Sequence, residues 1–178
     1  MAEHGSGTAI GGALVITAAH VVAGAENVEV RLGSVIYPAA IAAIDTQHDA
    51  AVLRAGGLDE SPIELRSALA GDSGTYLGFG GLTPGVKPFN VSRRITLDSE
   101  DIYVEGDYPR AGYELTADVV SGDSGAGLMV GGAVAGVVWA RSERAGSRAY
   151  AVDVRVFEPL LASVVGGTQT VAAPVRCP

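Results

Sequence analysis

Short apolar runs separated by glycines are the feature that most constrains the fold of this chain. The runs are rich in Val, Ile, Thr and Tyr, and no long stretch repeats with the 3.6-residue period of an amphipathic helix. Runs of this kind at even spacing are typical of an all-β sandwich or barrel. We therefore expect one or two helical turns at 18–23 and strands at 7–10, 13–17, 28–32, 35–44, 50–54, 74–79, 90–97, 113–117, 127–130, 133–139 and 148–152.

The apolar runs fall into two groups. Between them, the stretch 58–71 has few apolar residues in register and is expected to be a connector. The sequence thus predicts an N-terminal β half at 5–57 and a C-terminal β half at 72–152, followed by a short terminal helix at 153–165 and a tail at 166–178. Two stretches rich in Gly, Pro and Asp, 82–88 and 98–112, are expected to be loops.

Composition excludes several functional classes. The formal net charge is −8, which argues against nucleic acid as the main partner and against a basic helix lying on a membrane. The single cysteine, Cys177, excludes an internal disulfide and a cysteine metal site. No apolar run reaches about 18 residues and the start lacks a signal-peptide pattern, so we expect neither a membrane span nor a leader in this sequence.

Three local patterns occur in one order along the chain. His20 follows an apolar run and two alanines, Asp49 opens the apolar run 50–53, and Ser124 lies in the Gly-Asp-Ser-Gly sequence at 122–125. Each pattern alone is weak, and Gly-Asp-Ser-Gly occurs a second time at 71–74, around Ser73. The conjunction of all three is what points to a chemistry.

A serine hydroxyl is a poor nucleophile at neutral pH unless an adjacent base takes its proton. Histidine suits that task because its pKa lies near 7, and a carboxylate on its other ring nitrogen holds the correct tautomer. We therefore predict a catalytic triad of His20, Asp49 and Ser124. The backbone N–H groups of Gly122 and Ser124 are expected to form an oxyanion hole.

On these residues the chain resembles the chymotrypsin-fold, trypsin-like serine proteases. The resemblance adds the opening sequence Gly-Ser-Gly-Thr at 5–8 and covers nearly the whole chain. It is to the compact bacterial branch, in particular HtrA-type proteases and the membrane-anchored periplasmic acid-resistance proteases of actinobacteria. It implies an all-β fold of two antiparallel six-stranded barrels, with the site in the cleft between them.

The same resemblance implies the activity and its setting. The reaction would be endopeptidase hydrolysis of protein or peptide substrates through an acyl-enzyme, with no cofactor and no metal. The setting would be extracytoplasmic, with an N-terminal membrane domain that is absent from this chain. The resemblance also makes Ser73 an ordinary residue in the first strand of the second barrel.

Two other histidines and one other aspartate compete for the triad. His4 lies at the start of the chain, and His48 precedes Asp49, so on a strand it would point the opposite way. Asp45 would point the same way as Asp49 but has no apolar run directly after it. We therefore take His20 and Asp49.

Two residues are candidates for the substrate pocket. Asp118 lies six residues before Ser124, where the resemblance places the floor of the S1 pocket and implies selection of Arg or Lys at P1. An Asp hydrogen-bonded at a loop end is the alternative. Trp139 ends an apolar run and is expected either to line the substrate cleft or to fill the core.

The residue before the nucleophile, Asp123, raises the question of activation. In zymogen-activated relatives this residue pairs with a newly cut N-terminus, and here we expect Arg93, Arg94 or Arg141 to substitute. A lowered Asp123 pKa would support such pairing. The sequence leaves open whether the oxyanion hole is assembled at rest or collapsed by a flip of the Gly122–Asp123 peptide.

The chain departs from the family pattern in three places. Ala126 replaces a second Gly, which would cost about 1 kcal/mol if the site required a positive φ. Only five strands are expected in the first half, so its opening strand is expected to be missing and its open edges to invite self-association. For Cys177 the resemblance implies a bridge to a cysteine upstream of Met1, and an unpaired tail cysteine is the alternative.

Two other functions compete with an active protease. A catalytically incompetent protease-fold binding or scaffold module is favoured by the missing strand and by Ala126, but the complete triad argues against it. An α/β-hydrolase esterase is excluded because the histidine precedes the serine, the last Gly of the nucleophile motif is absent and strands do not alternate with helices.

Overall fold

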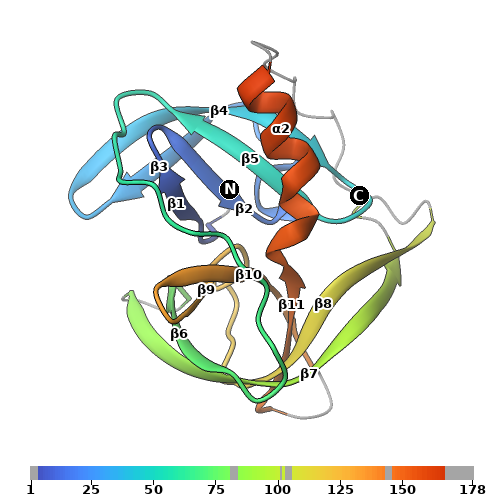
Figure 1. Cartoon of the computed structure of the whole chain (residues 1–178). Helices are drawn as coiled ribbons and strands as arrows, with labels where there is room; N and C mark the ends of the chain where they lie inside the picture. The colour runs from blue at the N-terminus through green and yellow to red at the C-terminus, as the bar shows by residue number, and fades with distance from the viewer. Residues whose placement is uncertain (1–3, 81–83, 101, 103–105, 143–145, 167–178) are drawn as a thin grey trace.

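The computed structural model describes residues 4–80, 84–100, 102, 106–142 and 146–166, so the predicted tail and Cys177 lie outside the described residues. Two β halves pack against each other, and a C-terminal helix lies against the first (Figure 1). The first half is an antiparallel sheet of five strands in the order β1-β2-β5-β4-β3. Its elements are β1 (Thr8–Gly11), β2 (Leu14–Thr17), helix α1 (Ala19–Val22), β3 (Val28–Leu32), β4 (Val35–Asp45) and β5 (Ala50–Ala55).

The second half is a closed antiparallel barrel in the order β10-β11-β8-β7-β6-β9. Its strands are β6 (Ser73–Gly78), β7 (Gly85–Glu100), β8 (Asp107–Ala117), β9 (Gly127–Val130), β10 (Ala133–Arg141) and β11 (Arg148–Asp153), followed by the 3₁₀ turn η1 (Val154–Phe157) and helix α2 (Glu158–Gly166). The predicted all-β class and the five strands of the first half are confirmed. None of the described helices is both long and apolar enough to cross a bilayer.

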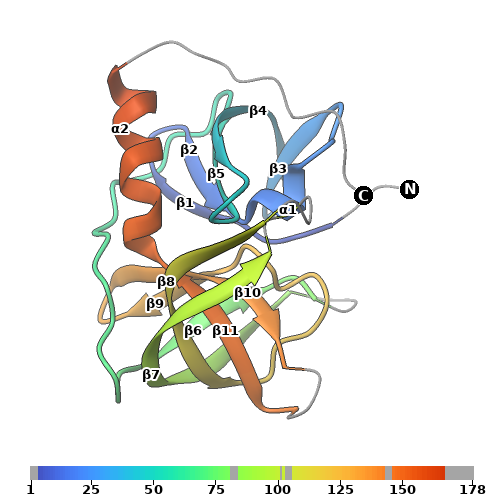
Figure 2. The same cartoon turned by 90° about the vertical axis from the view of Figure 1, so that its right-hand side faces the viewer.

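The expected loops at 82–88 and 98–112 are largely wrong. Strand β7 begins at Gly85, and β7 and β8 form a long hairpin whose pairing continues to Glu100 and Asp107. Cross-strand pairing outweighs the local turn composition, as is common in sheets. Beyond the paired end of this hairpin, Ile102 packs against the core of the first half and donates its N–H to the carbonyl of Thr46 at 3.3 Å. Figure 2 shows β7 and β8 extending toward the first half.

The two halves share one apolar core. Val134 and Val137 of β10 lie in the same buried cluster as Ile16 of β2, and Phe157 and Val164 complete it from η1 and α2. Helix α2 therefore carries the chain back from the second half onto the first. Burial of these side chains fixes how the halves meet, and a site between them can then be rigid.

One edge of the first sheet is partly covered. The connector pairs with β1, because Ile63 donates its N–H to the carbonyl of Ile10 at 3.2 Å and Glu60 bridges Gly12. Strand β3 is the other edge strand of this sheet. Self-association through an open edge stays a prediction.

A buried carboxylate, Asp153, ties the connector to the barrel. Ser67 donates its hydroxyl to Asp153 Oδ1 at 2.7 Å, and the Tyr113 hydroxyl donates to Oδ2 at 2.8 Å. The Tyr113 oxygen also accepts the N–H of Ala68 at 3.0 Å. Burial, with this hydrogen bond to Asp153, raises the pKa of Tyr113 above its usual value.

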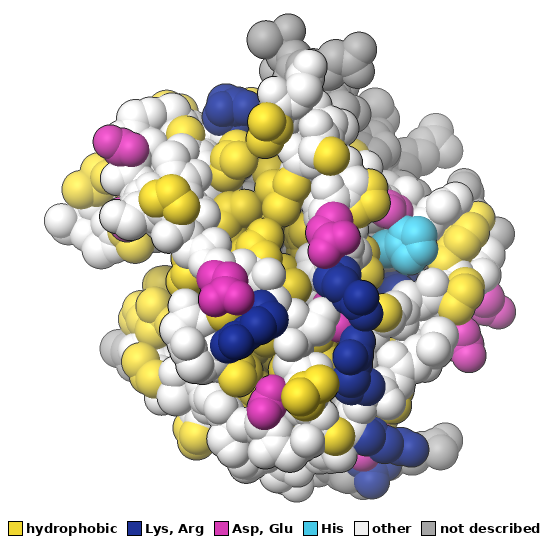
Figure 3. All heavy atoms as spheres, viewed as in Figure 1, with side chains coloured by type: hydrophobic (Ala, Val, Ile, Leu, Met, Phe, Trp, Pro, Cys, Tyr) yellow, Lys and Arg dark blue, Asp and Glu magenta, His cyan; other side chains and the backbone are white. Residues whose placement is uncertain are grey.

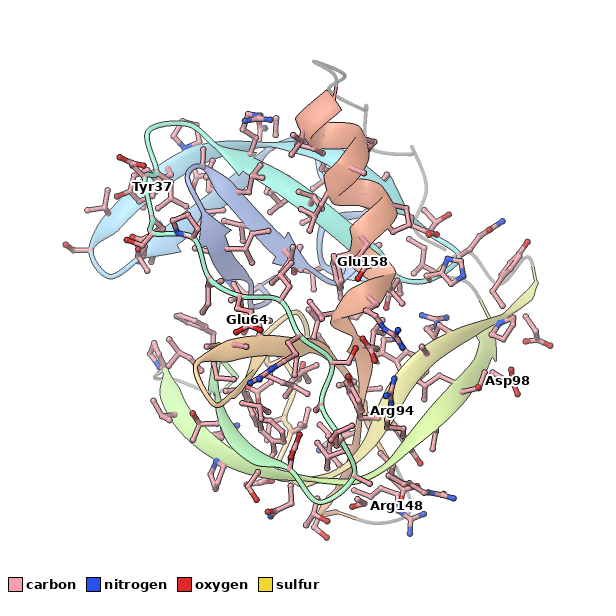
Figure 4. The ribbon with its side chains drawn as sticks, in the orientation of Figure 1. Tyr37, Glu64, Arg94, Asp98, Arg148 and Glu158 are labelled. Carbon is pink, nitrogen blue, oxygen red and sulfur yellow. The ribbon has the colours of Figure 1, made fainter. Side chains whose placement is uncertain are left out.

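Replacing Tyr113 by Phe is expected to lower the free energy of unfolding by about 1–3 kcal/mol, because two buried polar groups lose a partner. Urea denaturation measures this. Tyr37→Phe is the control, since the half-buried Tyr37 (Figure 4) has no hydrogen bond to its hydroxyl among the described residues. Equal stability of the two variants would show that the Asp153 network is not stabilising.

Candidate active site

His20 and Asp49 are held together by two contacts. His20 lies on α1, the single helical turn that directly follows β2. Its ring Nδ1 lies 2.7 Å from Asp49 Oδ2, and its backbone N–H donates to Asp49 Oδ1 at 2.8 Å. The Asp49 side chain is 2% exposed and the His20 ring 37%. A buried carboxylate therefore fixes both the position and the tautomer of a partly exposed imidazole.

Asp49 has an uncommon backbone conformation. Its φ is +55°, and it is the only non-glycine residue of the described chain with a positive φ. Aspartate tolerates this left-handed region better than most residues, but it is seldom used without a constraint. Here two contacts constrain the turn 45–49. The Asp45 carboxylate accepts the His48 N–H at 3.0 Å, and the Thr46 carbonyl accepts the Ile102 N–H.

The competing histidine and aspartate pair with each other. His48 Nδ1 lies 2.7 Å from Asp45 Oδ2, and both side chains are about one-third exposed. The described residues thus include two His–Asp pairs of similar local geometry, one with a buried carboxylate and one at the surface. The sequence identifies Asp45 and His48 as alternatives to Asp49 and His20 but does not predict that they pair with each other.

Ser124 lies in the second half, where its backbone contacts the first. Its hydroxyl donates to the carbonyl of Trp139 at 3.2 Å, and its own carbonyl accepts the N–H of Ser6 at 2.8 Å. The next residue, Gly125, has φ +91°, and a side chain there would collide with the Ser6 carbonyl and the Thr17 hydroxyl. Since Thr17 ends β2 just before α1, the nucleophile candidate lies against the segment that leads to His20.

Ser6 is a residue of the site that the sequence analysis missed. It is 3% exposed, and its hydroxyl donates to the carbonyl of Gly122 at 2.7 Å while accepting the N–H of Phe79 at 3.2 Å. Its carbonyl accepts the Thr17 hydroxyl at 2.7 Å. The sequence signal for this role is a hydroxyl side chain between two glycines, Gly5 and Gly7.

The residues before Ser124 form a tight turn. The N–H of Asp123 donates to the carbonyl of Val120 at 3.0 Å, and Gly122, the third residue of this turn, has φ +95°. A positive φ at the third position is the mark of a type II turn, whereas a type I turn requires a negative φ there. Because the two types differ by rotation of the central peptide, Gly122 selects one orientation of the Ser121–Gly122 peptide and hence of its own N–H. The peptide that orients the Gly122 N–H is therefore Ser121–Gly122, and not Gly122–Asp123 as expected from the sequence.

The partner of Asp123 is Lys87, so the expected arginine is wrong. Lys87 Nζ lies 2.7 Å from Asp123 Oδ2, and the carboxylate also accepts the N–H groups of Val120 at 3.0 Å and Gly80 at 2.9 Å. Burial alone would raise the pKa of Asp123. The hydrogen bonds from Lys87, Val120 and Gly80, with the Lys87 charge, outweigh burial and hold that pKa below its ordinary value.

The arginines lie elsewhere on the barrel. Arg93 contacts Glu114 at 2.7 Å and Arg94 contacts Asp153 at 3.3 Å, so both are engaged by other carboxylates. Figure 3 shows Lys and Arg side chains gathered below α2, and Figure 4 labels Arg94 and Arg148 on that face. Arg93 and Arg94 lie six and seven positions beyond Lys87 along β7, which carries both arginines away from Asp123.

The two pocket candidates differ in their surroundings. The Asp118 side chain is exposed, and its backbone carbonyl accepts the Tyr76 hydroxyl at 2.9 Å and Lys87 Nζ at 3.3 Å. Trp139 is half-buried, its carbonyl meets Ser124, and the Arg110 guanidinium lies 5.0 Å from its ring centre. The backbone of Trp139 therefore contacts Ser124 directly. Asp118 is the first residue of the segment 118–124 that ends at Ser124.

Ala126 carries no backbone strain. It is fully buried and donates its N–H to the Asp123 carbonyl at 3.0 Å without a positive φ. The cost considered for a methyl group at this position therefore does not arise. Within the described residues, no group of three or more His, Cys, Asp or Glu side chains could hold a metal ion.

Comparison with known proteins identifies the family. The family model described as a trypsin-like peptidase domain matches residues 5–137. The chain belongs to the trypsin-like peptidases. Its sequence is 35% identical over 140 residues to the serine protease Rv3671c of Mycobacterium tuberculosis, a match that covers 76% of this chain and 35% of that protein. The chain thus spans about a third of the length of the curated relatives it matches.

Solved structures of peptidases share the fold. The active form of the Rv3671c protease from M. tuberculosis gives a TM-score of 0.90 at 30% identity and covers 98% of this chain and 78% of that one. An inactive form gives 0.79 at 30% identity, covering 90% and 83%. The HtrA-type protease AlgW with a decapeptide gives 0.74 at 21% identity, covering 93% and 53%, a likeness of fold alone. The predicted chymotrypsin-like fold is confirmed, and the chain is a trypsin-like serine peptidase domain.

The lowered pKa of Asp123 predicts how the stability of this peptidase domain depends on pH. A depressed carboxyl pKa contributes stability that is fully present above about pH 4 and is lost as the pH falls through the native pKa. The stability advantage of wild type over Asp123→Asn should therefore shrink below about pH 4 in urea titrations. The exposed Asp59→Asn serves as control. A stability difference between wild type and Asp123→Asn that did not change with pH would contradict a lowered pKa of Asp123.

Proposed function

We propose that this domain is a serine endopeptidase that hydrolyses peptide bonds through an acyl-enzyme. Ser124 is the nucleophile, His20 the general base and acid, and Asp49 the residue that orients His20. The observation that carries the proposal is the double contact of Asp49 with the ring and the backbone of His20, at 2.7 and 2.8 Å. A carboxylate on Nδ1 leaves Nε2 to act on a hydroxyl.

The reaction follows from these roles. The Ser124 hydroxyl turns from the Trp139 carbonyl toward His20, gives its proton to Nε2 and attacks the substrate carbonyl carbon. The backbone N–H groups of Gly122 and Ser124 bind the oxyanion that forms. The protonated His20 then gives its proton to the leaving amine, and a water molecule repeats the sequence to release the acid and regenerate Ser124.

The ligand is a peptide, and the domain works outside the cytoplasm. An HtrA-type protease of the same fold has been solved with a decapeptide, which supports an extended peptide in the cleft. An extracytoplasmic setting is what the resemblance to periplasmic proteases implies. The Asp118–Gly122 segment and Trp139 line the pocket for the residue before the cleaved bond.

A fluorophosphonate probe is expected to label Ser124 of wild type, and mass spectrometry locates the adduct. Labelling should disappear in Ser124→Ala and fall at least about 10³-fold in His20→Ala, because the hydroxyl then has no base. Asp49→Asn should fall by about 10⁴, since the imidazole then loses the carboxylate that sets its tautomer.

The chain supplies matched controls for each of these variants. His48→Ala and Asp45→Asn alter the second His–Asp pair, and Ser73→Ala alters the second Gly-Asp-Ser-Gly sequence. All three should label as wild type does. A folded wild type that is not labelled would favour the incompetent binding module, which is consistent with a Ser124 hydroxyl that at rest donates to the Trp139 carbonyl.

Asp118 is expected to favour Arg or Lys before the cleaved bond. In Asp118→Asn, kcat/KM for substrates with Arg at P1 should fall by at least tenfold while that for Ala at P1 stays within about twofold, because only the cationic substrate loses a charge partner. Peptide libraries measure this ratio. An unchanged ratio would leave Asp118 as a loop residue that acts through its backbone alone.

A further inference from the structure

We propose that Lys87 is a positioning residue that keeps the oxyanion loop, residues 120–124, assembled by holding the buried carboxylate of Asp123. The site would then need no newly formed amino terminus to become competent. This inference deepens the proposed peptidase function and rests on it. It concerns how the site is kept in its working state, and not which residues react.

The contacts of Lys87 span the whole segment that ends in the oxyanion loop. Its ammonium group lies 2.7 Å from Asp123 Oδ2 and donates to the carbonyl of Asp118 at 3.3 Å. The Tyr76 hydroxyl makes the same two contacts from β6, at 3.4 and 2.9 Å. Side chains from the neighbouring strands β6 and β7 therefore contact both ends of the segment from Asp118 to Asp123.

Because it carries a positive charge, Lys87 stabilises the Asp123 carboxylate more than Tyr76 does. The Asp123 side chain is fully buried, and a buried carboxylate without a cation is strongly destabilised. Lys87, 23% exposed, brings its charge in from the surface along β7. Tyr76 supplies a hydrogen bond but no charge, and burial, with the charge of Asp123, raises its pKa above the usual value, so it stays neutral.

The Asp123 carboxylate is coupled to the orientation of Gly122. It accepts the N–H of Val120, and the backbone N–H of Asp123 donates back to the Val120 carbonyl, so both bonds close the same turn around Gly122. If the Asp123 carboxylate moved away from Lys87, its hydrogen bond from the Val120 N–H would break. The hydrogen bond from the Asp123 N–H to the Val120 carbonyl would then weaken. The Ser121–Gly122 peptide could then rotate, and the Gly122 N–H would leave the oxyanion position.

Removal of the Lys87 charge tests the proposal. In Lys87→Met, kcat for a peptide substrate and the rate of fluorophosphonate labelling should each fall by about 10²–10³, the usual loss of one oxyanion donor. KM should change by less than about threefold, and Lys87→Arg should recover most of kcat. Arg93→Met is the control, since it removes a cation from the same strand that contacts Glu114.

Amide hydrogen exchange is the readout that does not depend on activity. In Lys87→Met, the N–H groups of Val120 and Asp123 should lose protection, while that of Leu115 in the barrel stays protected as in wild type. Arg93→Met should leave all three unchanged. Loss of protection throughout the barrel would instead mean that Lys87 supports the fold as a whole, and would overturn a role in positioning.

If Lys87→Met does not fold, the charge can be removed from the folded protein. Lys87 is the only lysine of the chain, so carbamoylation converts this one amine side chain along with the terminal amine and the Cys177 thiol. Lys87→Arg treated in the same way reports the combined effect of the terminal amine and the thiol. Wild type should lose protection at Val120 and Asp123 after treatment, and Lys87→Arg should not.

The outcomes separate this inference from the proposed function. Labelled wild type with an equally active Lys87→Met or carbamoylated protein would overturn the inference and leave the peptidase in place. Unlabelled wild type with the expected exchange pattern would overturn the peptidase assignment and leave Lys87 as the residue that holds the loop. Unchanged exchange at Val120 and Asp123 would overturn the inference whatever the activity.

Discussion

The hydrogen bonds of Ser6 join the two halves at the site, and the rest of the site depends on them. One residue from the first half binds the carbonyl of Ser124 through its N–H and the carbonyl of Gly122 through its hydroxyl. Its own carbonyl binds Thr17, which ends the strand before His20. Because His20 comes from the first half and Ser124 from the second, the proposed proton transfer between them depends on contacts that hold the two backbones together. The shared apolar core of β10, β2 and α2 supports the same joint from within.

Three buried carboxylates organise the described structure, each with a different partner. Asp49 holds an imidazole, Asp123 holds an ammonium group and two backbone amides, and Asp153 holds two hydroxyl groups and an arginine. A buried charge is tolerated only where hydrogen bonds and opposite charges replace water. The three sites therefore constrain the positions of the elements around them. They constrain the turn before β5, the loop before β9 and the connector between the halves.

Particular residues show where reasoning from sequence succeeded. The short apolar runs predicted every strand except β7 and β8 to within about two residues, because apolar runs and turn residues are local properties. The pairing of His20 with Asp49 was also expected, since the order of the motifs and the apolar run after Asp49 distinguished it from Asp45. The partner of Asp123 was not, because β7 offers several cations and only the twist of the barrel decides which one faces inward. The length of the β7–β8 hairpin was underestimated for a related reason. Its Gly, Pro and Asp residues favour turns locally, but pairing with the partner strand keeps them extended.

The sequence by itself determined the all-β class, the division into two halves and the residue types that could form a triad. These follow from local periodicity and from chemistry that only a few side chains can perform. The tertiary structure alone decided that Ser6 binds the loop before Ser124, that Lys87 neutralises Asp123, and that Ile102 contacts the turn before Asp49. Each of these contacts joins residues that are distant in sequence, from 36 positions for Lys87 and Asp123 to 116 for Ser6 and Gly122. Which distant residues meet is set by packing and strand register, and a local pattern carries no information about either.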